Sequence, residues 1–129
     1  MNKILVEVSA GELLDKISIL EIKKEKIKNS EKLKFINNEY QILKEQLDKS
    51  IKSNEKIQKL FNSLKEINSK LWVIEDDKRI CEKNKDFSKD FIELARSVYL
   101  NNDKRSKIKA DINKILGSNI KEIKQYEQY

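Results

Sequence analysis

Histidine and proline are absent from this chain of 129 residues, and it has only two glycines and one cysteine. Without histidine there is no imidazole base, no histidine metal ligand and no Ser-His-Asp triad. One cysteine forms neither an internal disulfide nor a four-cysteine zinc site. Two glycines are too few for a P-loop or a G-x-G-x-x-G turn. The scarcity of turn residues disfavours a β-sandwich and predicts long helices with few breaks.

No run of apolar residues reaches the length of about 18 needed to span a membrane. The N-terminus is a poor signal peptide, because Glu7 interrupts its short apolar stretch. With one thiol and no export signal, we expect a cytoplasmic protein of a single domain, residues 1–129.

The net charge of +6 comes from 28 basic and 22 acidic residues. Each half of the chain has a net charge of +3, and lysine alternates with glutamate, as on solvated helix surfaces. There is no basic arm of the kind that binds nucleic acid, so we disfavour nucleic-acid binding.

The hydrophobic periodicity predicts an all-α fold. Residues 4–8 are short and β-branched, which predicts a short N-terminal extended segment. Ser9 and Glu12 form a capping box, which places the start of a helix at Ser9, and this helix runs to about Lys28. It is apolar on more than one face, since Ile19 and Ile22 lie off its main apolar stripe. We therefore expect it either to be central in a bundle or to be buried by a partner.

Three further amphipathic segments follow. Apolar residues at spacings of three and four predict one helix after Asn29 and a second over residues 54–84. These two are long enough to form an antiparallel helical hairpin with coiled-coil-like packing. A fourth helix begins near Ser88, with a turn or kink expected at residues 101–103, and ends at Gly117. Residues 118–129 are expected to form a flexible tail, a short helix or a partner contact.

All three arginines lie in or between two segments, residues 71–82 and 91–113, and the first of these holds the only tryptophan. Arginine offers a planar fork that suits carboxylate or phosphate. One interpretation is a structural polar network between the third and fourth helices, formed by Glu75, Arg79, Glu82 and Asp103. The other is a pocket for a phosphorylated or other anionic ligand, lined by Arg79, Arg96, Arg105 and Lys109.

Clustered carboxylates at Glu75, Asp76 and Asp77 are donors that Mg²⁺ prefers, but consecutive residues point in different directions on a helix. We therefore predict no metal, no cofactor and no catalytic residues. Trp72 is expected in the core or at an interface, because it lacks the basic surroundings of a base-stacking platform.

Three segments carry a resemblance: GELLDKISILEIKKEKI (residues 11–27), LWVIEDDKRICE (71–82) and FIELARSVYLNNDKRSKIKADIN (91–113). Together they resemble a family of short bacterial and phage proteins that is known only as a domain of unknown function. The resemblance implies a single helical domain and brings no activity or ligand.

We accordingly expect a helical bundle that acts as a non-catalytic interaction or assembly module. It is expected to form a homodimer or higher homo-oligomer through Ile19, Ile22 or the tail. A different protein partner is a second alternative. The alternatives are binding of an anionic ligand, as a binding protein or an enzyme, and binding of nucleic acid.

Overall fold

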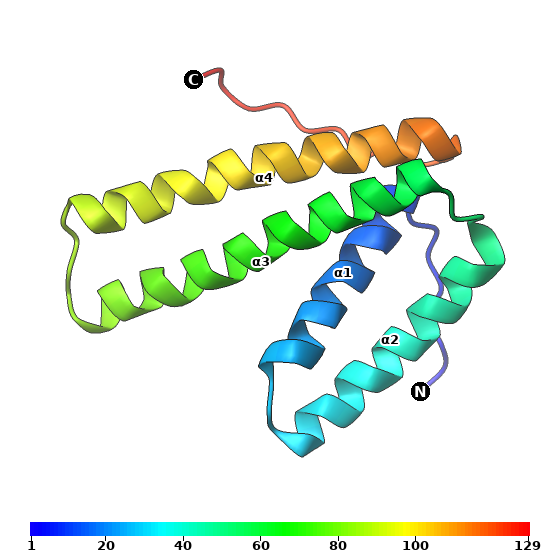
Figure 1. Cartoon of the computed structure of the whole chain (residues 1–129), viewed down its shortest axis with the longest axis horizontal. Helices are drawn as coiled ribbons and strands as arrows, with labels where there is room; N and C mark the ends of the chain where they lie inside the picture. Colours follow the sequence, from blue (N-terminus) through cyan, green and yellow to red (C-terminus); the bar gives the residue numbers. More distant parts are fainter.

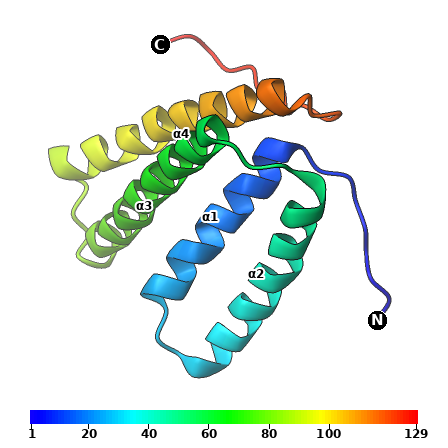
Figure 2. The same ribbon diagram turned by 45° about the vertical axis from the view of Figure 1, so that its right-hand side comes forward.

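The computed structural model describes all 129 residues and contains four helices and no strand. They are α1 (Ala10–Lys26), α2 (Ser30–Ser50), α3 (Glu55–Lys83) and α4 (Lys89–Leu116). The chain forms two antiparallel hairpins, α1–α2 and α3–α4, whose far ends diverge so that the molecule is V-shaped (Figures 1 and 2). The predicted all-α class and the extended N-terminal segment are thus confirmed. No helix is both long enough and apolar enough to cross a membrane.

Short polar segments set the ends of the helices. Ser9 caps α1 by accepting a hydrogen bond from the Glu12 amide at 3.1 Å, as predicted. Asn29 and Asn54 cap α2 and α3 in the same way, each at 2.9 Å. α4 ends at Gly117, whose φ of 63° lies in the left-handed region that favours glycine.

Two predictions are wrong, one about which helices pair and one about a break in the fourth helix. The long hairpin is formed by the third and fourth helices, whereas α2 packs along α1 and does not pack against α3. α4 also continues unbroken through residues 101–103, where a turn or kink was predicted. The amide of Asn101 donates to the Ser97 carbonyl one turn earlier, at 2.8 Å, so this side chain bonds within the helix without ending it.

α1 is the central helix, because it packs against all three others. Its second apolar face is therefore covered within the chain, and Ile22 is only 1 % exposed. This removes Ile22 from the residues expected at a dimer interface. The main core contains Leu14, Ile57, Leu64 and Ile112. It lies where α1 crosses the half of the α3–α4 hairpin that is remote from the turn at residues 84–88. We call this the proximal half and the half next to the turn the distal half.

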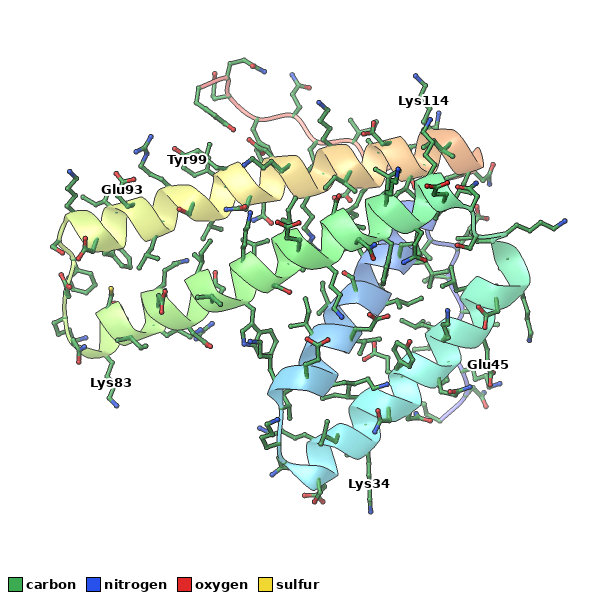
Figure 3. The ribbon with its side chains drawn as sticks, in the orientation of Figure 1. Lys34, Glu45, Lys83, Glu93, Tyr99 and Lys114 are labelled. Carbon is green, nitrogen blue, oxygen red and sulfur yellow. The ribbon has the colours of Figure 1, made fainter.

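The tail, residues 118–129, is not helical and runs back along α4 (Figure 1). The Tyr129 ring packs edge-on against the Tyr99 ring, with centroids 5.3 Å apart. Figure 3 shows Tyr99 on the side of α4 that faces away from α3. The tail therefore covers part of the outer surface of α4.

Candidate functional site

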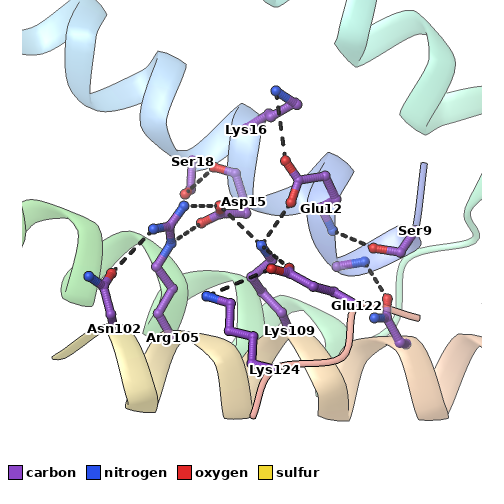
Figure 4. A network of polar contacts seen from close by, with 12 residues as sticks. Ser9, Glu12, Asp15, Lys16, Ser18, Asn102, Arg105, Lys109, Glu122 and Lys124 are labelled. Atoms are coloured by element: carbon purple, nitrogen blue, oxygen red, sulfur yellow. Dashed lines mark hydrogen bonds and ion pairs between the residues drawn. The ribbon is translucent and has the colours of Figure 1, made fainter. Parts of the chain in front are cut away.

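A network of charged and polar side chains lies where the N-terminal half of α1 crosses α4 (Figure 4). α1 contributes Glu12 and Asp15, one turn apart, and α4 contributes Arg105 and Lys109, also one turn apart. Asn68 of α3 and Glu122 of the tail complete it. The network thus joins three helices and the tail at one place.

Asp15 is its most deeply buried charged member, with 1 % of its surface exposed. Its carboxylate accepts a bidentate pair from the Arg105 guanidinium, with Nε to Oδ1 at 2.9 Å and Nη2 to Oδ2. The Asn68 amide donates to the same carboxylate and to the Ser18 hydroxyl, both at 2.8 Å. Ser18 in turn donates to the Asp15 carbonyl at 2.8 Å, so α1, α3 and α4 share one chain of hydrogen bonds.

Lys109 joins three carboxylates. Its Nζ lies 2.8 Å from Glu12, 3.7 Å from Asp15 and 3.2 Å from Glu122. Lys124 of the tail also reaches Glu122, at 3.7 Å. Lys109 therefore ties the middle of the tail to α1 and α4.

The helices approach closely here because position 11 has no side chain. The Gly11 amide donates to Oδ1 of Asn113 at 2.7 Å, and a Cβ at this position would lie 2.6 Å from the Lys109 carbonyl oxygen. The Ala10 amide donates to the Ser118 hydroxyl at 3.1 Å. Free amides of the first turn of α1 are thus satisfied by Asn113 near the end of α4 and by Ser118 at the start of the tail.

The pKa values of Asp15, Lys109 and Arg105 are all shifted in the direction that favours the charged form. Burial raises the pKa of Asp15, but hydrogen bonds from Arg105 and Asn68 and the nearby positive charges outweigh it and hold that pKa below its usual range. Burial lowers the pKa of Lys109, whereas Glu12 and Asp15 raise it by a larger amount. The hydrogen bond to Asp15 raises the pKa of Arg105. These three groups keep their charges at neutral pH, so their contacts suit a structural lock that holds α1 against α4 better than acid–base catalysis.

The structure places the predicted site residues in separate environments. Arg105 and Lys109 lie together in the network described above. Arg79 is 80 % exposed and is 4.0 Å from Glu75, and Arg96 pairs with Glu93 at 3.2 Å. Arg96 precedes Arg105 by about 13 Å along the axis of α4. The three arginines therefore do not converge on one pocket, contrary to the expectation, because each binds a different carboxylate.

The predicted polar network is also distributed over separate pairs. Glu75 pairs within α3, with Lys78 at 3.4 Å and Arg79 at 4.0 Å, and Glu82 pairs with Lys85 at 3.7 Å. Asp103 accepts a hydrogen bond from the Tyr129 hydroxyl at 2.5 Å. These side chains lie on outer surfaces, so they do not join α3 to α4.

Sequence reasoning missed Asp15, Ser18 and Asn68. The available signal was a stripe on α1 in which Gly11, Asp15, Ser18 and Ile22 recur at spacings of four, three and four residues. A small residue and a carboxylate on the same stripe as a buried isoleucine indicate a close, polar helix contact. The asparagine partner on α3 carries no comparable signal.

The chain belongs to a family of unknown function, DUF6165, whose family model matches residues 4–129. This confirms the resemblance to a family without an assigned activity. No curated protein and no solved structure matches the chain.

Proposed function

We propose that this protein is a non-catalytic interaction module that self-associates through the distal half of its α3–α4 hairpin. The observation that carries the proposal is the lack of burial in this part of the molecule. No side chain between positions 69 and 108 is buried. In Figure 1 the hairpin extends well beyond α1, so its distal half is a single layer of two helices.

A layer of two helices cannot cover its own apolar residues. The inner seam of the distal hairpin contains Leu71, Ile74, Phe91, Leu94 and Val98, all only partly buried. Stable domains cover such a stripe with another element. In the proximal half α1 supplies that cover, and in the distal half we propose that a second molecule supplies it.

Helical periodicity identifies the face involved. α1 covers the side of the hairpin that carries Leu64 and Asn68 on α3 and Lys109 and Asn113 on α4. Continued by turns of three to four residues, the same side forms what we call the open face. It consists of Trp72, Glu75, Arg79 and Glu82 on α3 and Phe91, Ala95 and Val98 on α4. Tryptophan, phenylalanine and arginine are enriched at protein interfaces.

The charges favour a second copy of this chain as the occupant. Residues 70–104 contain eight basic and eight acidic residues, so the whole net charge of +6 lies outside the distal hairpin. Two copies therefore repel one another least where their distal hairpins meet. The open face itself carries Arg79 between Glu75 and Glu82, and a two-fold axis can pair these opposite charges with each other. The product is a four-helix, coiled-coil-like arrangement.

A charge swap tests this pairing. Arg79→Glu and Glu75→Arg each place like charges across the two-fold axis, so each alone should dimerise at least tenfold more weakly in sedimentation equilibrium. An equimolar mixture should recover the association as a heterodimer.

The control is Lys32→Glu/Lys34→Glu on α2, whose side chains are exposed on the other hairpin. It should dimerise as the wild type does, because it leaves the open face intact. Failure of the mixture to associate, or equal weakening by the control, would contradict the proposed interface.

We also propose that the protein is cytoplasmic. Cys81 is the only cysteine and has no partner for a disulfide, and thiols stay reduced in the cytoplasm.

A further inference from the structure

A cavity of about 520 Å³ lies between the C-terminal half of α4 and the tail. Five lysines line it, namely Lys107, Lys109, Lys114, Lys121 and Lys124. Glu122 is the only carboxylate among the lining residues. The volume falls in the range of small-molecule sites, which is roughly 300–1,000 Å³.

Two of the five lysines have an ion-pair partner within the chain, and three do not. Lys109 and Lys124 both pair with Glu122, at 3.2 Å and 3.7 Å. Lys107, Lys114 and Lys121 are exposed and form no ion pair within the chain. Figure 3 shows Lys114 projecting from α4 on the side away from α3. The cavity thus holds positive charge that the protein itself does not balance.

We propose that this cavity binds a small ligand with several phosphate groups, and that Glu122 occupies the position of one phosphate while the cavity is empty. Lysine is a point charge that binds phosphate oxygens without a fixed geometry. Ser106 and Asn113 add polar groups to the wall. No aromatic ring lines the cavity, so it has no surface on which a nucleobase stacks, and the ligand is recognised by its charge.

In this proposal the tail and the ligand compete for Lys109. A phosphate that reaches Lys109 replaces the Glu122 carboxylate, while Glu12 and Asp15 keep their contacts with the same ammonium group. Binding therefore competes with the tail contact and leaves the lock between α1 and α4 in place.

The test is isothermal titration calorimetry with tripolyphosphate at constant ionic strength. The wild type should bind, and Glu122→Gln should bind several-fold more tightly because the internal competitor has lost its charge. Glu127→Gln is the matched control, because Glu127 lies on the same tail outside this cavity and should leave affinity unchanged.

A second pair of variants tests the lysines. Lys107→Ala/Lys114→Ala removes two unpaired charges and should weaken binding by about tenfold or more, since a lost charge-assisted contact commonly costs that much. Lys32→Ala/Lys34→Ala on α2 removes the same charge elsewhere and should have little effect. Circular dichroism spectra should match the wild type for every variant.

Three results would overturn the proposal. They are no heat of binding for either the wild type or Glu122→Gln, equal effects of Glu122→Gln and Glu127→Gln, and tighter binding of an oligonucleotide than of tripolyphosphate at equal charge. The last result would instead favour nucleic acid as the ligand. The cavity lies about 24 Å along α4 from Phe91 of the open face, so loss of binding and loss of self-association are separate outcomes.

Discussion

Arg105 on α4 forms a bidentate pair with Asp15 on α1, ninety positions earlier in the chain. Asp15 is buried and Arg105 is half-buried where α1 crosses the α3–α4 hairpin, and Asn68 and Lys109 bind the same carboxylate. The pair fixes how α1 lies across the hairpin. It thereby sets which part of the hairpin is covered within the chain and which part is left open.

Loss of the buried carboxylate should destabilise the fold strongly. Asp15→Asn keeps the size of the side chain but leaves Arg105 without its partner, and removal of one member of a buried pair commonly costs about 3–5 kcal/mol. Urea unfolding should show this loss in the free energy of unfolding. Glu93→Gln, which breaks the exposed pair with Arg96, should change the free energy by less than about 1 kcal/mol. Equal effects of the two substitutions would argue against the lock.

The Asp15 carboxylate should also make the stability of the fold depend on pH. The pKa of Asp15 is lower in the folded protein than in the unfolded chain, so the unfolded chain binds more protons between these two values. The resulting stability is fully present above the unfolded pKa of about 3.9 and is lost as the pH falls through the folded pKa. Urea unfolding between neutral and strongly acidic pH should show a smaller decline for Asp15→Asn than for the wild type. Parallel declines would contradict this assignment.

Gly11→Ala tests the close contact between α1 and α4. The new Cβ would lie 2.6 Å from the Lys109 carbonyl oxygen, which is backbone and cannot turn away. Forced displacement of packed helices commonly costs about 1–3 kcal/mol, and it should outweigh the gain of about 1 kcal/mol from replacing glycine by alanine in a helix. A thermal unfolding curve should therefore shift to lower temperature, whereas an upward shift would show that α1 is not held against α4 as described.

Much of the local structure could be predicted from the sequence. Ser9 and Gly117 marked the start of α1 and the end of α4, since a serine cap and a left-handed glycine act through neighbouring backbone atoms alone. The pairing of the hairpins could not be predicted in this way. Both connections that flank α3 are short, so the choice between α2 and α4 as its neighbour depends on contacts distant in sequence, such as Gly11 with Asn113.

Only the basic residues of the candidate site could be predicted from the sequence. Arg105 and Lys109 were predicted as lining residues of an anion pocket, but their partner Asp15 has the sequence position of an ordinary residue in the first turns of a helix. Its burial follows from the close approach at Gly11, which brings α4 over a polar stripe of α1. Arg79 and Arg96 have the same side chain as Arg105, yet no helix crosses over them.

Hydrogen exchange should report the unequal burial of the two halves of the hairpin. Amides in residues 72–98 should exchange faster at low protein concentration than amides near Leu64 and Ile112, which are fully buried. At high concentration a second copy should slow exchange in the distal segment. Exchange that does not depend on concentration in residues 72–98 would speak against contact there.

Self-association is the central claim, and sedimentation equilibrium of two matched variants beside the wild type tests it most directly. Arg79 on the open face and Lys34 on α2 are both exposed, so Arg79→Glu and Lys34→Glu make the same change of charge at exposed sites. We predict that the wild type and Lys34→Glu form dimers as concentration rises, and that Arg79→Glu stays monomeric over the same range. A wild type that sediments as a monomer at every concentration, or equal dimerisation of all three proteins, would contradict the account.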